Sequence, residues 1–221
     1  MKKNLLCTAC FCILISPILH AESFSGPTLG IQGGVSSGQI KQDTTDGSGS
    51  ITSNEVSSTS GIAVATAGIG EIYNNFYYGG EVRATFTGGN TKTAVGPSSG
   101  AMVATKPGTS VIVAGRGGML FTERAMGFVS LGVGLAEVSY TVQDSGGTLT
   151  TKKNDMIFVP GVGTEIALTE SLNARFDISY TIGKKRTMAK ADLVSAGIAS
   201  YTNATFKPKW INCSIGVNYR F

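Results

Sequence analysis

Hydrophobic and polar residues alternate one by one in the last segment of the chain, from Ile211 to Phe221. The odd-numbered positions are apolar or aromatic, whereas the even-numbered positions are polar, glycine or arginine. Successive side chains of an extended strand point to opposite faces, so this pattern predicts a β-strand with one apolar and one polar face. The same alternation recurs in earlier segments and is the main organising signal of the sequence.

Eight such segments follow one another, each about long enough to cross a bilayer as a tilted strand. They cover residues 28–37, 61–72, 76–87, 110–121, 127–141, 156–168, 172–183 and 209–221. Three connections are tight, at 73–75, 122–125 and 169–171, and four are long and polar, at 38–60, 88–109, 142–155 and 184–208. Strict alternation of short and long connections predicts an all-β fold, an eight-stranded antiparallel up-and-down transmembrane β-barrel with four long extracellular loops.

Charged residues of the predicted strands are assigned to the inward phase. They are Glu71, Glu81, Arg83, Arg116, Glu165, Arg175, Asp177 and Arg220. The interior of an eight-stranded barrel is only wide enough for side chains, and arginine can bind carboxylates bidentately. Four acids and four arginines therefore predict a lumen plugged by salt bridges. Two alternatives stay open: a charged filter of a small pore, and acid–base chemistry by two carboxylates such as Glu81 and Asp177.

The segment 127–141 is the exception to the alternation. Val129 to Leu135 set an outward phase that Val138 and Tyr140 abandon. We expect either a β-bulge near Ala136 and Glu137 or emergence of the strand above the bilayer.

Residues 1–21 have the parts of a secretory signal peptide. Lys2 and Lys3 precede an apolar run over 5–15, and Ala21 is a small residue suited to cleavage. The apolar run is too short for a transmembrane helix, which needs about 20 residues. The sequence therefore predicts a cleaved signal peptide, a single barrel domain over 22–221, and location in the outer membrane of a Gram-negative cell.

Removal of this signal peptide would remove the single histidine and three of the four cysteines, leaving Cys213. A chain without imidazole has no Ser-His-acid or Cys-His site and no histidine-ligated metal. We therefore expect no catalytic site, no metal and no cofactor. The charges are dispersed, without the basic stripe that nucleic acid would require.

Lysines are expected in the long loops or at their edges. Candidate contacts for lipopolysaccharide phosphates near the strand ends are Lys152, Lys153, Lys184, Lys185, Arg186, Lys207 and Lys209. The alternative is that these are ordinary solvated loop ends. The loop 38–60 is rich in Gly, Ser and Thr, and we expect it to be flexible.

Three stretches resemble the small outer-membrane β-barrel superfamily that includes the opacity proteins, OmpX and the membrane domain of OmpA. They are YYGGEVRATF from Tyr77, PGVGTEIALTESLNARFDISYT from Pro160, and VNYRF from Val217. The resemblance implies surface exposure, often with adhesion to host cells through the loops. It also implies that Ile215, Val217, Tyr219 and Phe221 form the assembly signal read by the barrel assembly machinery.

Two functions therefore compete. The first is a surface protein for adhesion, host interaction or outer-membrane integrity, and the second is a porin-like channel for small solutes. The long loops and the balanced lumen charges favour the first. The expected partners are outer-membrane lipids and lipopolysaccharide, the assembly machinery, and host-cell or matrix components, with the protein itself a monomer.

Overall fold

The computed structural model describes residues 24–46, 51–88, 94–95, 102–144, 147–189 and 201–221. Its strands are β1 (Gly26–Asp46), β2 (Ile51–Tyr73), β3 (Phe76–Gly88), β4 (Ala94–Val95), β5 (Met102–Thr122), β6 (Ala125–Asp144), β7 (Gly147–Ala167), β8 (Leu172–Gly183), β9 (Arg186–Ala189) and β10 (Tyr201–Arg220). Within these ranges no helix is long and apolar enough to cross a membrane. The proposed signal peptide lies outside the described residues and stays a prediction.

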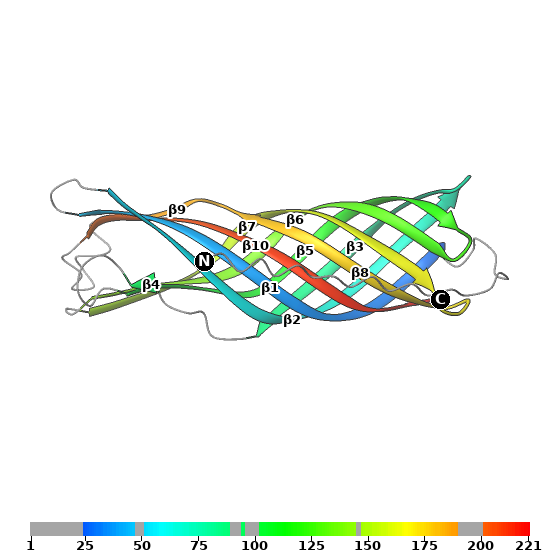
Figure 1. Cartoon of the computed structure of the whole chain (residues 1–221), viewed down its shortest axis with the longest axis horizontal. Coiled ribbons are helices and arrows are strands. Elements are labelled where there is room, and N and C mark those ends of the chain that lie inside the picture. Colours follow the sequence, from blue (N-terminus) through cyan, green and yellow to red (C-terminus); the bar gives the residue numbers. More distant parts are fainter. Residues whose placement is uncertain (1–23, 47–50, 89–93, 96–101, 145–146, 190–200) are drawn as a thin grey trace, which may run out of the picture.

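Eight strands form a closed antiparallel ring in the order β1-β2-β3-β5-β6-β7-β8-β10, and pairing of β10 with β1 completes it. The short strands β4 and β9 pair with β5 and β10. Figure 1 shows the strands wound obliquely around the long axis, with the tight turns and Phe221 at one end and β4 and β9 at the other. The predicted eight-stranded up-and-down barrel is confirmed.

The end with the tight turns is bound together by backbone hydrogen bonds between neighbours. In the β2–β3 turn, Asn74 and Asn75 have φ angles of 56° and 106°, a region that asparagine tolerates better than most residues. The backbone N–H of Leu120 donates to the carbonyl of Asn75 at 2.9 Å, and that of Arg220 donates to Ser171 at 2.7 Å. These bonds fix each turn against the next strand.

At the other end the strands are longer than the sequence predicted. β1 and β2 stay paired as far as Thr45 and Ile51, and β6 and β7 as far as Asp144 and Gly147. The predicted loops 38–60 and 142–155 are therefore mostly hairpin strands. The assignment of residues 39–46 and 51–58 to a loop was wrong, because backbone pairing forms a polar hairpin that needs no apolar face, and the flexibility of this segment stays a prediction.

The irregularity expected in β6, the strand that contains Ala136 and Glu137, lies in the neighbouring strand β5. β6 pairs with β7 in continuous register, whereas the register of β5 shifts between Pro107 and Ser110. The predicted bulge at Ala136 and Glu137 was therefore wrong. Val138 breaks the outward pattern because its side chain is buried inside the barrel.

The outer face carries large apolar side chains that would be costly to leave in water. On β6, for example, Val129, Leu131 and Val133 are each about 60% exposed. Aromatic side chains gather on this face near the tight turns, at Tyr73, Phe76, Tyr78, Phe121, Tyr219 and Phe221. An apolar outer band with an aromatic girdle is typical of a barrel that faces lipid.

Candidate functional site

Six charged side chains meet inside the barrel, and we call them the lumen cluster. They are Glu81 and Arg83 on β3, Arg116 on β5, Glu165 on β7, and Arg175 and Asp177 on β8. The strand alternation places each on the inward phase, and each side chain is at most 7% exposed. Strands distant in sequence thus bring three acids and three arginines together.

Arg175 is the centre of the lumen cluster. Its Nη1 lies 2.6 Å from Glu81 Oε2 and its Nη2 lies 3.1 Å from Glu81 Oε1, which is a bidentate pair. Its Nε donates to Asp177 Oδ2 at 2.8 Å, and its Nη2 also contacts this oxygen. Glu165 Oε1 is 3.8 Å from Nη1. The guanidinium therefore meets all three carboxylates.

The other two arginines connect the same acids. Arg83 Nη2 lies 2.6 Å from Glu81 Oε1 and 3.4 Å from Asp177 Oδ2. Arg116 Nη2 lies 2.5 Å from Glu165 Oε1, and its Nη1 lies 3.6 Å from Glu81 Oε2. Each charge of the cluster therefore has an opposite partner, which offsets the desolvation cost of burial.

Aromatic rings support the arginines from the turn end of the barrel. The Cζ of Arg116 is 4.0 Å from the centre of the Phe128 ring, and that of Arg175 is 4.9 Å from the same ring. These distances fit cation–π contacts. A Cβ at Gly163 would overlap the Phe128 ring, so the glycine makes room for it. This ring was not predicted from the sequence, although an aromatic residue on the inward phase of its strand was the signal for it.

The lumen is filled by apolar side chains between the lumen cluster and the tight turns. This buried group consists of Phe24, Tyr77, Leu120, Met126, Phe128 and Ala167. Phe24 precedes β1, and only 2% of it is exposed. The segment leading into the barrel thus contributes a side chain to the seal at this end.

Beyond the lumen cluster most buried inward residues are apolar or hydroxyl-bearing, and Asp155 of β7 is a fully buried acidic exception that the sequence had placed in a loop. On β7, the positions after Glu165 towards the far end are buried Val159 and Ile157, and on β8 they are Ser179 and Thr181. A cavity of about 30 Å³ lies here among Ser36, Thr85, Thr87, Gly108, Ser110, Ala136, Ile157, Thr181, Trp210 and Asn212. This volume suits one or two water molecules.

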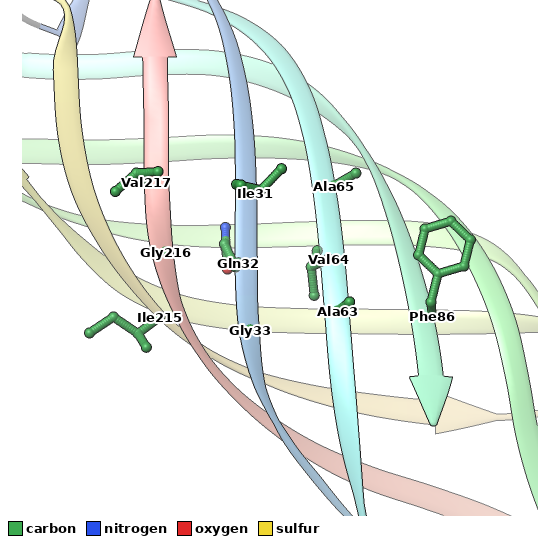
Figure 2. Close-up of a pocket in the computed structure, with 10 residues that line it drawn as sticks. All are labelled: Ile31, Gln32, Gly33, Ala63, Val64, Ala65, Phe86, Ile215, Gly216 and Val217. Atoms are coloured by element: carbon green, nitrogen blue, oxygen red, sulfur yellow. The ribbon is translucent and has the colours of Figure 1, made fainter. Parts of the chain in front are cut away.

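A larger hollow of about 520 Å³ lies on the outer surface (Figure 2). Ile31, Ile215 and Phe86 flank it on the outward phase, whereas Gln32 and Val64 point to the inside. Gly33 leaves the surface open because no side chain projects there. The hollow is an indentation of the lipid-facing wall, separate from the lumen.

Two residues assigned to the lumen network lie elsewhere. Glu71 is exposed on the outward phase, opposite Tyr78 and close to the β2–β3 turn. Its inward assignment was wrong, and its position at the turn end explains how a charge is tolerated there. Arg220 is on the inward phase but near the tight turns, where it donates to the carbonyls of Ser25 at 2.9 Å and Glu170 at 2.6 Å.

The basic candidates for lipopolysaccharide contact lie beyond the apolar band. Lys152, Lys153, Lys184, Lys185 and Lys209 are exposed, Lys207 is half-buried, and the side chain of Arg186 is outside the described residues. Four of them belong to strands β7 and β10 and not to loops. The candidate assembly residues Ile215, Val217, Tyr219 and Phe221 all face outward, and Tyr219 and Phe221 form an edge-to-face pair at 5.1 Å.

Within the described part of the chain, no group of three His, Cys, Asp or Glu side chains is placed to hold a metal ion. Glu81 and Asp177, the carboxylates considered for acid–base chemistry, both accept hydrogen bonds from Arg175. Fixed ionised pairs of this kind favour a structural plug over proton transfer.

Comparisons with known proteins add the following. No family model and no curated protein sequence matches the chain. Among solved structures, it is similar to the outer membrane protein OprG from Pseudomonas aeruginosa, with 13% identity, a TM-score of 0.59, and coverage of 91% of this chain and 99% of that one. Neisserial surface protein A matches at 11% identity and a TM-score of 0.45, with coverage of 86% and 97%. Ail of Yersinia pestis matches at 14% identity and a TM-score of 0.43, with coverage of 89% of this chain and 99% of that one. The likeness to OprG shows that this chain has the fold of the small outer-membrane β-barrels.

Proposed function

We propose that the protein is a sealed outer-membrane barrel that presents its long hairpins at the cell surface for adhesion, host interaction or membrane integrity. The observation that carries the proposal is the lumen cluster, a buried and charge-balanced plug across the barrel interior. With the interior filled, the surfaces available to a partner are the outer wall and the two ends.

The outer wall supports a membrane location. On β8, outward Phe176, Ile178, Tyr180 and Ile182 follow one another at every second position, and each is between a third and a half exposed. The eleven residues from Leu172 to Ile182 span roughly 25 Å along the barrel axis at a strand tilt near 40°, which matches the apolar band of an outer-membrane barrel. The fold shared with OprG supports the same location.

The hairpins support a surface role. β1 continues about eleven residues past Val35, its last large outward apolar residue, and stays paired with both β2 and β10 to its end. Three adjacent strands therefore project together beyond the band by roughly 30 Å. Paired strands are already ordered before a partner binds, so binding loses little conformational entropy.

The channel alternative has less support. A conducting path would have to cross the apolar group at the turn end and then separate the arginines from their carboxylates. Breaking buried pairs costs several kcal/mol for each stranded charge. A pore built on this lumen would need a large rearrangement.

Shortening the β1–β2 hairpin tests the display function. Residues 39–58 are excised and replaced by a short Gly-containing turn, so that Ser37 remains opposite Thr59 in the native register. We expect heat-modifiable mobility of the barrel to be unchanged, and attachment of bacteria to host cells or extracellular matrix to fall severalfold. The excised strands lie beyond the lipid-facing band, so their loss leaves the barrel intact.

A matched variant shortens the β6–β7 hairpin by residues 141–150, where Thr141 pairs with Thr150. It removes ten residues, half as many as the first excision, from the opposite side of the ring, and it shows whether one hairpin or several bind. Normal attachment after shortening each projecting hairpin in turn would refute an adhesive role.

A further inference from the structure

The outward phase changes from apolar to cationic at a single step on two neighbouring strands. On β8 the last outward apolar residue is Ile182, and exposed Lys184 follows directly after the strand, which ends at Gly183. On β10 the step runs from Ile211 to Lys209 and then to Lys207. Lys209 is paired with Ile182, so the two steps lie at the same level of the barrel.

β7 adds a fourth lysine on the adjoining side. Lys152 lies on the outward phase of this strand, two outward steps past exposed Met156. We call Lys152, Lys184, Lys207 and Lys209 the lysine ridge. Neighbouring strands are about 4.8 Å apart, so β7, β8 and β10 cover roughly 10 Å of the barrel rim, and Lys152 lies roughly 13 Å further along β7 than Met156, which is next to the residue paired with Gly183.

The ridge is one-sided. Lys152 lies 4.0 Å from Glu137, and the exposed Lys184 and Lys209 keep the ridge cationic. Described outward residues at the same rim on β2, β3 and β6 are Thr59, Gly88 and Glu137, none of them cationic. Among the residues whose side chains are described, the cationic ones at this rim therefore gather on the side of β7, β8 and β10.

The chemistry at this level is that of a lipid headgroup. Outward residues just below the ridge face acyl chains, and residues just above it face water, so the lysines lie where a membrane presents its phosphates. Lysine binds phosphate as a point charge on a flexible stem, and basic clusters beside a membrane span recognise anionic headgroups. A soluble protein partner would meet the projecting hairpins first.

We propose that the lysine ridge binds the phosphates of lipid A in the outer leaflet. The proposal rests on the proposed outer-membrane location. Lipid A carries two phosphates on one headgroup, so one molecule can meet lysines of neighbouring strands together. A lipid held there would pack along Ile182 and Ile211 and would orient the barrel relative to the outer leaflet.

The test compares two charge-matched double variants of the full refolded protein in uncharged detergent. K184Q/K209Q removes two ridge charges, and K92Q/K106Q removes two from the sequence 88–109 that connects β3 with β5, two strands that are not neighbours of β8 or β10 in the ring. Native mass spectrometry measures binding of diphosphoryl lipid A, of the same lipid without phosphates, and of phosphatidylglycerol.

We expect K184Q/K209Q to weaken binding of diphosphoryl lipid A by tenfold to about thirtyfold, because each lysine near a headgroup contributes about a factor of five. K92Q/K106Q should stay within about twofold of the unmodified protein, and K184R/K209R should restore binding. Both glutamines keep most of the side-chain stem, and unchanged heat-modifiable mobility verifies folding.

Equal losses of lipid A binding in the two double variants would show that the binding site is not the lysine ridge. Equal binding of phosphate-free lipid A would show that the phosphates are not recognised. Equal affinity for phosphatidylglycerol would replace lipid A by anionic glycerophospholipid as the ligand. None of these outcomes changes adhesion through the hairpins or the closed lumen, so failure here is distinguishable from failure of the proposed function.

Discussion

Arg175 shows how much can depend on one residue of this barrel. Its side chain is 1% exposed and contacts Glu81 and Asp177 through both sides of the guanidinium group. A buried ion pair adds little net stability, but removing one partner leaves an uncompensated charge. The consequence of changing Arg175 is therefore determined by the carboxylates that remain.

Replacement of Arg175 by Met should lower the free energy of unfolding by about 3 kcal/mol, because it leaves three buried carboxylates against only two arginines, Arg83 and Arg116, in a site with little water. The urea midpoint of the folded barrel measures the loss. The double variant R175M/E81Q, which restores charge balance in the lumen cluster, should recover part of it. An unchanged midpoint in R175M would mean that Arg175 is solvated.

The same scale shows what the sequence could and could not predict about the site. Arg175 and Asp177 were assigned correctly to the inside because Ala174, Phe176 and Ile178 form an unbroken outward phase around them. Glu71 was misassigned because β2 has apolar residues on both phases, with Ile62 buried and Ile69 exposed. Where both faces are apolar, alternation does not determine the direction of a charged side chain.

At the scale of elements, the membrane-crossing part of each strand was predictable and its continuation was not. Lipid on one side and a filled lumen on the other impose the period-two pattern that located β8 at 172–183. Above the band both faces of a strand meet water, so the polar run of β1 past Gly38 carries no such pattern. Its pairing with β2 and β10 depends on backbone hydrogen bonds, which are independent of side-chain type.

The closing strand β10 is also the element that we propose the assembly machinery recognises. Phe221→Ala should lower the amount of folded, heat-modifiable barrel in the outer membrane while leaving export unchanged, because it removes the last and most exposed aromatic residue of the outward row Ile215, Val217, Tyr219 and Phe221. Phe86→Ala, an equivalent loss on the outward face of β3, serves as the control. Equal yields for the two variants would show that Phe221 acts only as another lipid-facing side chain.

At the scale of the whole molecule, the interior is filled at successive levels along the barrel axis. The outer surface changes along the same axis from an apolar band to polar hairpins. From the turn end, the levels are the apolar group around Phe24, the lumen cluster, and buried residues such as Val138 and Trp210. Barriers in series do not depend on one another, so opening one leaves the others closed. This arrangement supports the proposed surface role over transport through the lumen.

Refolded protein in planar bilayers should therefore give no steady single-channel steps in potassium chloride. The double variant R175A/E81A should also remain silent, although it shortens two side chains of the lumen cluster, because Phe128 on one side and Val138 on the other still fill the lumen. A channel-forming protein added afterwards to the same bilayer confirms that insertion would have been detected. Stable conductance steps from the unmodified barrel would contradict the sealed lumen and would make solute transport the better account of this fold.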